Sequence, residues 1–294
     1  MTRIAESELV LNPDGSVYHL NLQPDQIAKT IITVGDPDRV FEISKHFDRI
    51  DAKVQKREFI THTGELGGKR ISVIGTGIGT DNMDIVFNEL DALVNIDLKT
   101  RTIKKELTSL DFIRIGTSGC MQKDIPLDSL LISTFGLGLD GLLHYYKYSL
   151  NYEESILQEN FSKYISSKIQ LPIRPYFAIG STELLTFFGE EMLRGITVTC
   201  PGFYAPQGRK LRIPLASEDI LTVLSGFSYN KERITNFEME TSAIYGFAKM
   251  MGHRAISCNA LIANRQHQSF SPNSKKAVQK LIEKVLSKIS NWTG

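Results

Sequence analysis

The sequence predicts an α/β fold in which helices flank a central, mainly parallel or mixed sheet, and three observations support this. Short apolar runs alternate with longer segments of helical periodicity along the chain. Several of the apolar runs end in glycine-rich segments, as strands do before a helix. The chain has 294 residues, of which 41% are hydrophobic, enough for one large domain or two small ones. We predict a single domain, residues 1–294.

Composition excludes several classes of protein. The formal net charge is +1, so bulk charge gives no indication of binding to nucleic acid or to an anionic membrane. Three widely spaced cysteines suit neither a disulfide framework nor a CxxC metal site. No apolar run is long enough to span a membrane, and the N-terminus lacks the apolar core of a signal peptide. We therefore expect a cytoplasmic protein.

Residues 1–24 are polar and rich in turn-forming residues, and we expect them to form an arm that lies against another surface. His19 lies between apolar neighbours within this arm. Spacing alone favours a histidine held by local packing, and a role in a binding site stays open as the alternative.

A first strand is predicted at residues 31–34, followed by the turn sequence GDPDR. Gly35 permits close approach of the backbone, and Pro37 is suited to the first turn of a helix. Arg39 would lie in that first turn, where a cation opposes the helix dipole. An anionic partner explains such a position, and an ordinary surface arginine is the alternative.

Next, residues 54–66, which include Arg57, are predicted to form one strand that leads into a hairpin at Gly67 and Gly68. The strand at 71–74 ends in a further glycine-rich segment, GTGIG. Thr80 or Asp81 is the expected N-cap of the helix that follows. Neither a Walker loop nor a dinucleotide-binding fingerprint fits this segment.

The stretch 111–123 is the central one, because a short apolar run holds Arg114 and then meets the sequence GTSG. Two glycines around Thr117 and Ser118 predict a turn in which backbone N–H groups form an anion-binding nest. Arg114 would either enter the core, which is costly without a partner, or lie beside the nest and bind a phosphate-like group. We favour the nest, and an ordinary turn beside an exposed arginine remains the alternative.

The second half of the chain alternates in the same way, and the segment 180–201 is treated as a loop. The expected elements are strands at 130–134, 176–179 and 255–262 and helices at 155–169, 243–251 and 273–289, with Gly136, Gly138 and Gly141 in a loop.

Two further segments of this half carry candidate site residues. The loop 201–212 holds Phe203, Gln207 and Arg209, which could bind a flat heterocycle, although solvated turn residues are the simpler interpretation. Glu238 and Glu240 precede the helix at 243–251, where carboxylates are also favoured simply by the helix dipole.

These motifs together resemble the nucleoside phosphorylase family, and within it the uridine phosphorylase branch. The resemblance runs from about His19 to Arg265 and is carried by GDPDR at residues 35–39, RIGTSG at 114–119, FEMET at 237–241 and NR at 264–265. It implies a single-domain nucleoside phosphorylase-like fold. The implied reaction is the reversible phosphorolysis of uridine to uracil and ribose 1-phosphate, with phosphate as co-substrate and without any cofactor or metal.

The resemblance also implies roles for individual residues. Phosphate would be bound by Gly35, Arg39, Arg114 and Thr117, and by Arg57 of a neighbouring subunit. Ribose would be bound by Met239, Glu240 and the neighbour's His19, and the base by Phe203, Gln207, Arg209 and Arg265. Arg114, Glu240, Gln207 and Arg209 would be catalytic, and shared sites imply a homodimer or a trimer of dimers.

Two alternatives stay open. A purine nucleoside phosphorylase or a nucleosidase would share the ribose architecture, but the resemblance leads us to expect an aspartate after the last strand in those enzymes, where this chain reads Ala263, Asn264, Arg265, Gln266. A non-catalytic nucleoside-binding protein is the second alternative, and the presence of Arg39, Arg114 and Glu240 argues against it.

Overall fold

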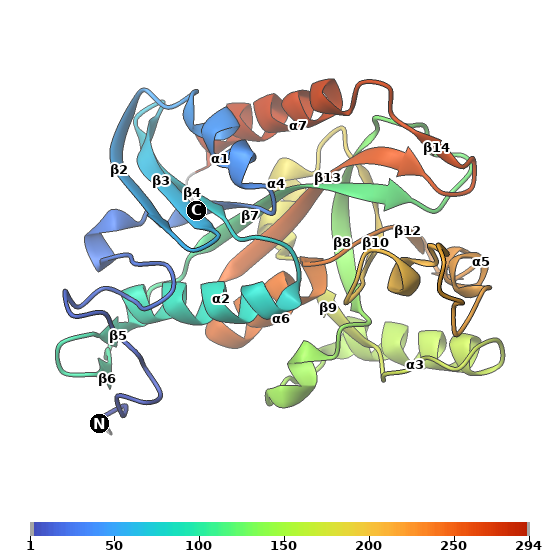
Figure 1. Cartoon of the computed structure of the whole chain (residues 1–294), viewed down its shortest axis with the longest axis horizontal. Helices are drawn as coiled ribbons and strands as arrows, with labels where there is room; N and C mark the ends of the chain where they lie inside the picture. Colours follow the sequence, from blue (N-terminus) through green and yellow to red (C-terminus); the bar gives the residue numbers. More distant parts are fainter. Residues whose placement is uncertain (1–2, 293–294) are drawn as a thin grey trace. The chain divides into compact units, whose positions relative to one another are not determined.

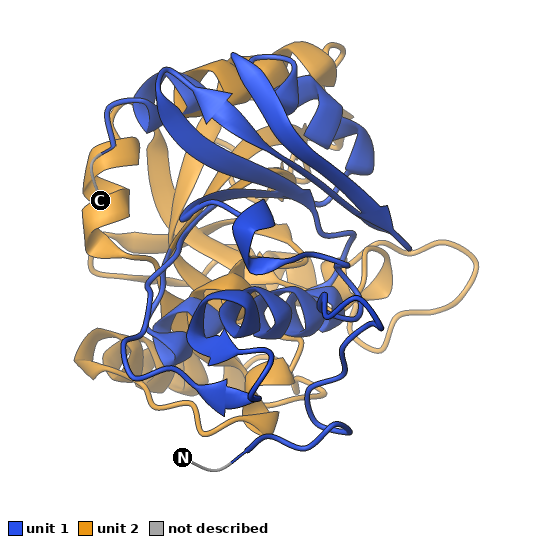
Figure 2. Cartoon of the chain, turned by 90° about the vertical axis from the view of Figure 1, so that its left-hand side faces the viewer, with its two compact units in different colours: residues 1–113, 247–254, 286–294 blue, residues 114–246, 255–285 orange. Residues whose placement is uncertain are grey.

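The computed structural model describes residues 3–292 and shows a mixed α/β fold (Figure 1). The chain divides into two compact units (Figure 2). Unit 1 comprises residues 1–113, 247–254 and 286–294, and unit 2 comprises residues 114–246 and 255–285. Nothing in this division tests whether the chain is a single domain, which stays a prediction.

Unit 1 contains a mixed sheet with the strand order β1-β4-β3-β2. β1 and β4 are parallel, whereas β3 pairs antiparallel with both β4 and β2. Every residue of β1 is buried, as expected of a strand covered on both faces. The bounds are β1 (Thr30–Val34), β2 (Arg49–Lys56), β3 (Phe59–Leu66), β4 (Lys69–Gly75), β5 (Ile96–Asp97) and β6 (Thr102–Ile103).

The first helix of unit 1 begins where the sequence predicts. α1 (Pro37–Ser44) starts at a proline, and the Asp36 side chain caps it by accepting a hydrogen bond from the Asp38 N–H. α2 (Thr80–Asn95) follows Gly79, whose φ of 102° is unfavourable for any other residue, and it buries an apolar stripe that includes Phe87 and Leu90. A short 3-10 helix, η1, covers Pro24–Gln26.

Unit 2 is built on a ring of five strands. The order β12-β10-β8-β13-β7 closes because β7 also pairs with β12, through Cys120 opposite Asn236 and Gly119 opposite Phe237. Three shorter strands extend this sheet. The bounds are β7 (Asp111–Cys120), β8 (Leu130–Gly138), β9 (Tyr176–Ile179), β10 (Leu193–Thr199), β11 (Ser228–Tyr229), β12 (Glu232–Glu238), β13 (Arg254–Asn264) and β14 (Ser269–Phe270).

Helices accompany this ring in unit 2, and α3 contacts β9 while α5 contacts β12. Their shared core is rich in aromatic residues, among them Phe135, Phe161, Phe177 and Phe227. The helix bounds are α3 (Tyr152–Ser166), α4 (Thr182–Phe188) and α5 (Ile220–Ser225), with 3-10 turns η2 (Leu142–Tyr145) and η3 (Ala205–Gln207). Two helices begin in unit 2 and end in unit 1, namely α6 (Thr241–Met251) and α7 (Ser274–Ile289). Within residues 3–292, no helix combines the length and the apolar composition that crossing a bilayer requires.

Most predicted elements are present, but four predictions were wrong. Residues 54–66 form two strands, because the chain turns at Arg57, whose φ is 53°. The segment treated as a loop, 180–201, contains α4 and β10. The predicted N-cap at Thr80 or Asp81 is Gly79 instead. Finally, Gly136 and Gly138 belong to β8 rather than to a loop.

The two glycines of β8 are needed for space rather than for turning. A Cβ on Gly136 would lie 2.7 Å from the Cα of Ser242, and one on Gly138 would lie 2.2 Å from the Tyr176 ring. Their presence therefore reflects close approach of neighbouring groups, which a sequence cannot distinguish from a need for positive φ.

Candidate active site

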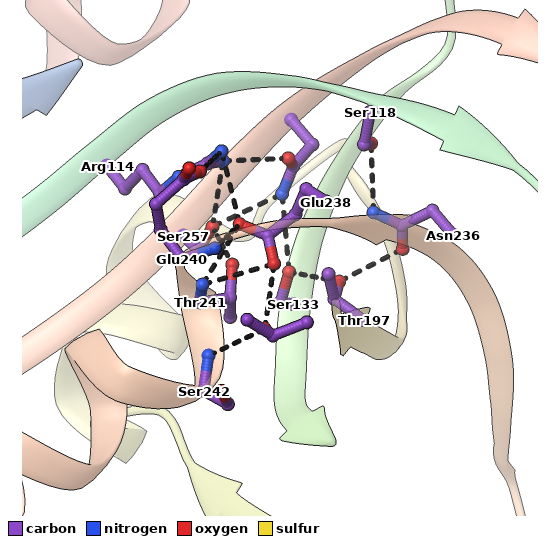
Figure 3. A network of polar contacts seen from close by, with 12 residues as sticks. Arg114, Ser118, Ser133, Thr197, Asn236, Glu238, Glu240, Thr241, Ser242 and Ser257 are labelled. Atoms are coloured by element: carbon purple, nitrogen blue, oxygen red, sulfur yellow. Dashed lines mark hydrogen bonds and ion pairs between the residues drawn. The ribbon is translucent and has the colours of Figure 1, made fainter. Parts of the chain in front are cut away.

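Polar side chains from all five strands of the ring meet in its interior (Figure 3). On β10, β12 and β13 they occur at every second position, and on β7 they lie four positions apart, so alternation along each strand directs them to the same side. Hydrogen bonds join them into one network. The members are Arg114 and Ser118 on β7, Ser133 on β8, Thr197 and Thr199 on β10, Asn236 and Glu238 on β12, and Ser257 and Asn259 on β13.

Arg114 is the cation of this network, and only 5% of it is exposed. Its Nη2 lies 2.6 Å from Glu240 Oε2 and 3.1 Å from Glu238 Oε2. Its Nη1 donates to Asn259 Oδ1 at 3.0 Å. Arg114 and Glu240, two of the residues predicted to form the site, are therefore in direct contact.

Glu238, to which the sequence assigned no function, holds both Arg114 and the start of α6. Its carboxylate accepts the backbone N–H groups of Glu240 and Thr241 at 2.9 Å and the Thr199 hydroxyl at 2.8 Å. A carboxylate at a helix N-terminus satisfies N–H groups that lack partners within the helix. Glu238 thus fixes the backbone on which Glu240 is carried.

The charges of this group are strongly interdependent. Burial disfavours a charged guanidinium, but Glu238 and Glu240 outweigh that effect and raise the pKa of Arg114. Burial raises the pKa of the Glu238 carboxyl, while Arg114 opposes the rise. Any change at Arg114 therefore alters the pKa of Glu238.

The predicted turn and anion nest at residues 116–119 are absent, because β7 continues without a break to Cys120. Neither Gly116 nor Gly119 has a positive φ. A Cβ on Gly116 would lie 1.9 Å from Arg114 Nη1, so this glycine leaves room for the guanidinium. The preferred placement of Arg114 beside a nest was therefore wrong: Arg114 enters the buried network, where carboxylates supply the partners that a core arginine requires.

The loop after β10 contains three of the four predicted base-binding residues, and Arg265 contacts this loop. All four lie in unit 2 and are called the loop cluster below. The Arg209 guanidinium stacks 3.8 Å from the centre of the Phe203 ring and donates to Gln207 Oε1 at 2.5 Å. Arg265 donates to the Gln207 backbone oxygen at 2.9 Å. Gln207 is only 3% exposed, whereas Phe203 is 51% exposed. A fixed amide beside an open aromatic face suits a flat ligand with polar edges.

Both arginines of this loop cluster lie close to Phe237 of β12. Burial lowers the pKa of Arg209 to about 10, and the neighbouring charge of Arg265 adds to this effect. Burial likewise lowers the pKa of Arg265. Two guanidinium groups that are partly desolvated and close together favour an electron-rich partner that neutralises them.

In unit 1, Gly35 and Arg39 follow β1 as predicted. A Cβ on Gly35 would lie 3.3 Å from the backbone oxygen of Gly77, because the ends of the parallel strands β1 and β4 lie side by side. Arg39 lies in the first turn of α1, with 12% of its side chain exposed and Asp36 at 3.9 Å.

His19 and Arg57 also meet in unit 1, around the ring of Tyr18. The His19 and Tyr18 ring centres are 4.9 Å apart in an edge-to-face arrangement. The Arg57 guanidinium lies 5.7 Å from the Tyr18 ring centre, and the Lys56 ammonium lies 4.8 Å from it. The N-terminal arm and the β2–β3 turn therefore form one cationic and aromatic cluster.

Two predicted residues, Met239 and Thr117, lie next to members of the network along the chain. Met239 is half-buried between the two carboxylates of FEMET, and Thr117 is half-buried on β7. Alternation along β7 directs Thr117 away from the side shared by Arg114 and Ser118. Their roles in binding stay predictions.

Comparison with known proteins identifies similar chains. Uridine phosphorylase from Thermococcus kodakarensis is 27% identical over 99% of this chain and 92% of its own length. Uridine phosphorylase from Haemophilus influenzae is 29% identical over 92% of this chain and 94% of its own. Among solved structures, a Trypanosoma brucei nucleoside phosphorylase described as showing uridine phosphorylase activity matches with a TM-score of 0.85 and 26% identity over 95% of this chain and 99% of its own. The model of the phosphorylase superfamily matches residues 29–289, and the chain belongs to this superfamily.

Proposed function

We propose that this protein is a uridine phosphorylase, which cleaves uridine reversibly with phosphate to give uracil and ribose 1-phosphate. The observation that carries the proposal is the loop cluster, which includes Phe203, Gln207 and Arg209, in the same unit as the Arg114–Glu240 pair. The loop cluster offers an open aromatic face and a fixed amide to a pyrimidine. The Arg114–Glu240 pair offers an anion-binding group next to an acceptor for sugar hydroxyls.

The chemistry requires charge stabilisation at two places. As the bond between C1′ and the base nitrogen breaks, its electron pair goes to the base and positive charge develops on the ribose. Phosphate stabilises the cationic sugar and then bonds to C1′, so no covalent intermediate with the enzyme is required. Gln207 and Arg209 stabilise the negative charge that spreads to the uracil oxygens, and Arg265 supports them through the Gln207 backbone.

In this proposal Arg114 changes partners when phosphate binds. Its guanidinium is held by Glu238 and Glu240, and phosphate offers it a more highly charged acceptor. Glu240 then accepts the ribose hydroxyls, with Met239 beside it. The roles of Gly35, Arg39 and Thr117 in phosphate binding stay predictions from the family resemblance. The reaction needs neither a metal nor an organic cofactor.

The proposal extends to assembly and location. His19 and Arg57 complete the site of a neighbouring subunit in a homodimer or a trimer of dimers, where His19 approaches the 5′-hydroxyl and Arg57 approaches phosphate. A cytoplasmic location suits the three cysteines, which are all free and buried.

The decisive experiment incubates the purified chain with uridine in the presence and absence of phosphate and follows the ultraviolet change on release of uracil. We expect cleavage that requires phosphate. Inosine and adenosine, tested in parallel, address the purine alternative, and cleavage without phosphate would indicate a nucleosidase. A purified protein inert toward uridine in phosphate buffer would refute the proposal.

A variant tests the base-binding role directly. We expect Gln207→Ala to lower kcat/KM for uridine by about tenfold to a hundredfold, because hydrogen bonds to a group that becomes charged contribute about 1.5–3 kcal/mol. Gln279→Ala on α7 is the matched control and should leave the kinetics unchanged, because the Gln279 amide donates to Glu283 at an exposed position and belongs to no predicted site. Unaltered uridine parameters in Gln207→Ala would remove Gln207 from the site.

A further inference from the structure

Glu89 on α2 binds His19 by two hydrogen bonds and Leu20 by a third, a contact that no pattern in the sequence predicts. Its carboxylate accepts the backbone N–H of His19 at 2.8 Å, the backbone N–H of Leu20 at 2.8 Å and His19 Nδ1 at 2.7 Å. Glu89 is only 9% exposed, and all three residues belong to unit 1. A nearly buried carboxylate thus accepts hydrogen bonds from two adjacent residues of the N-terminal arm.

This arrangement determines which ring nitrogen of His19 carries the proton. An ionised carboxylate accepts hydrogen bonds and cannot donate them, so Nδ1 must be the protonated nitrogen. In the neutral imidazole, Nε2 then carries the lone pair and acts as an acceptor. Carboxylates hold metal-binding histidines in a fixed tautomer by the same means.

The surroundings of His19 leave Nε2 available for a ligand. The imidazole packs nearly perpendicular to the Tyr18 ring, which Lys56 and Arg57 in turn contact. The His19 side chain is 32% exposed. Within residues 3–292, hydrogen bonds to the ring involve Nδ1 alone. The Nε2 atom of His19 is therefore the group best suited to a ligand. It is a hydrogen-bond acceptor held in one orientation, and a hydroxyl is a suitable donor to it.

We propose that Glu89 is a positioning residue that sets the specificity of the enzyme for nucleosides with a free 5′-hydroxyl. It acts through His19, whose Nε2 accepts that hydroxyl in the site of a neighbouring subunit. The inference rests on the proposed function for the identity of the substrate. The contact between Glu89 and His19 is independent of that function and can be tested without any turnover.

A competing explanation is that Glu89 merely anchors the arm by capping two backbone N–H groups. Glu89→Gln separates the two explanations, because glutamine has nearly the same shape but presents both an acceptor and a donor. Its amide group can donate to Nδ1, which moves the imidazole proton to Nε2 and turns the acceptor into a donor. If the role of Glu89 were purely structural, Glu89→Gln would lower kcat/KM for all substrates alike.

The first measurement records long-range ¹⁵N–¹H spectra of the full-length protein labelled at histidine, at a pH where the imidazoles are neutral. His19→Asn identifies the signal among the six histidines. We expect the Nδ1–H tautomer in the wild type and the Nε2–H tautomer in Glu89→Gln. An Nε2–H tautomer in the wild-type protein would overturn the proposal, even if Glu89→Gln failed to fold.

The second measurement compares uridine with 5′-deoxyuridine. We expect Glu89→Gln to lower kcat/KM for uridine by about five- to tenfold, the effect of one neutral hydrogen bond, and to leave that for 5′-deoxyuridine nearly unchanged. The double variant with His19→Ala should be no worse on uridine than His19→Ala alone. Asp84→Asn removes the same charge from the same helix and is the control.

The outcomes distinguish failure of the proposal from failure of the function. Equal losses on both nucleosides, or additive effects in the double variant, would assign Glu89 a structural role and overturn the inference. A wild-type protein without activity on uridine would refute the proposed function and, with it, the specificity role. The tautomer measurement would still show whether Glu89 sets the proton position of His19.

Discussion

At the scale of single residues, Arg114 is the group with the largest energetic consequences. Its guanidinium is buried with two carboxylates, Glu238 and Glu240, at 3.1 Å and 2.6 Å. Burying ions is costly, and the mutual attraction offsets this cost only while every partner is present. The same property allows Arg114 to exchange a carboxylate partner for an anionic ligand, since phosphate is also a strong hydrogen-bond acceptor.

We predict that Arg114→Ala abolishes phosphorolysis, mainly by removing phosphate binding, with a rate loss of a hundredfold or more, about 3 kcal/mol. The variant also leaves Glu238 and Glu240 buried without their cation, which should lower the free energy of unfolding by about 3–5 kcal/mol. Steady-state kinetics over a range of phosphate concentrations and chemical denaturation measure the two effects.

The matched control is Arg233→Ala, which breaks an exposed pair with Asp124 whose side chains are 40% and 63% accessible. Its effect on stability should stay within about 1 kcal/mol, because solvent screens such pairs. Nearly normal kinetics in Arg114→Ala would contradict the assigned role.

The sequence identified Arg114 but predicted its surroundings incorrectly, and the reason is physical. Glycine permits a positive φ and also permits close packing, and its presence does not say which property is used. At Gly116 the space is occupied by the Arg114 guanidinium, so the strand continues. Glu238 was noted only as a carboxylate before a helix and received no role in the site, although it alternates with Asn236 on β12. Polar residues at every second position of a buried strand were the available signal.

At the scale of elements, the polar interior of the ring depends on how closely α6 approaches β8. A Cβ on Gly136 would lie 2.7 Å from Cα and 2.9 Å from N of Ser242, both backbone atoms. Backbone cannot move aside as cheaply as a flexible side chain. The start of α6 carries Glu240, so packing at Gly136 and geometry of the Arg114 network are linked.

We therefore predict that Gly136→Ala lowers the free energy of unfolding by about 1–3 kcal/mol through overpacking and reduces activity as well. Thermal unfolding and uridine kinetics measure the two effects. Gly252→Ala is the control, because no atom lies within 4 Å of its added Cβ and only its φ of 74° is unfavourable. Equal behaviour of the two variants would show that steric overlap at Gly136 is not the cause.

The contact between α1 and β3 should make stability depend on pH. His62 on β3 is 3% exposed, and its Nδ1 lies 2.8 Å from the Ser44 hydroxyl of α1. Burial lowers the pKa of His62, and Lys53 contributes further. The folded protein thus keeps His62 neutral where the unfolded chain takes up a proton, so this stabilisation is present above pH 6.5 and is lost on acidification.

We predict that the stability difference between the wild type and His62→Gln shrinks as the pH falls from about 7.5 to about 5, across the ordinary titration range of histidine. Denaturant unfolding at each pH provides the measurement. A stability difference between His62→Gln and the wild type that stays constant over this pH range would contradict the prediction.

Most elements were predictable from the sequence, whereas two strands of the ring were not. β1, β9 and α7 follow from apolar periodicity. β10 and β12 were overlooked, because Thr197 and Asn236 interrupt their apolar pattern. The ring closes only through tertiary pairing between β7 and β12, which no local signal in the sequence specifies.

For the whole molecule, the proposed assembly places residues of one chain in the site of another. Arg57 and His19 lie together in unit 1 around Tyr18, and Arg114 and Glu240 lie together in unit 2. If the first pair serves a neighbouring subunit, lesions in the two pairs affect different sites of a mixed dimer. One site of such a dimer then carries both lesions and the other carries none.

We predict that Arg57→Ala and Glu240→Gln are each nearly inactive, and that co-expression of the two restores about a quarter of the wild-type activity, since half of randomly formed symmetric dimers contain one intact site of two. Differently tagged chains allow the mixed species to be purified and assayed. Arg114→Ala mixed with Glu240→Gln is the control and should recover nothing, because both residues are assigned to the same chain of each site. Absence of recovery in the first mixture, with mixed dimers present, would mean that each chain builds its site alone.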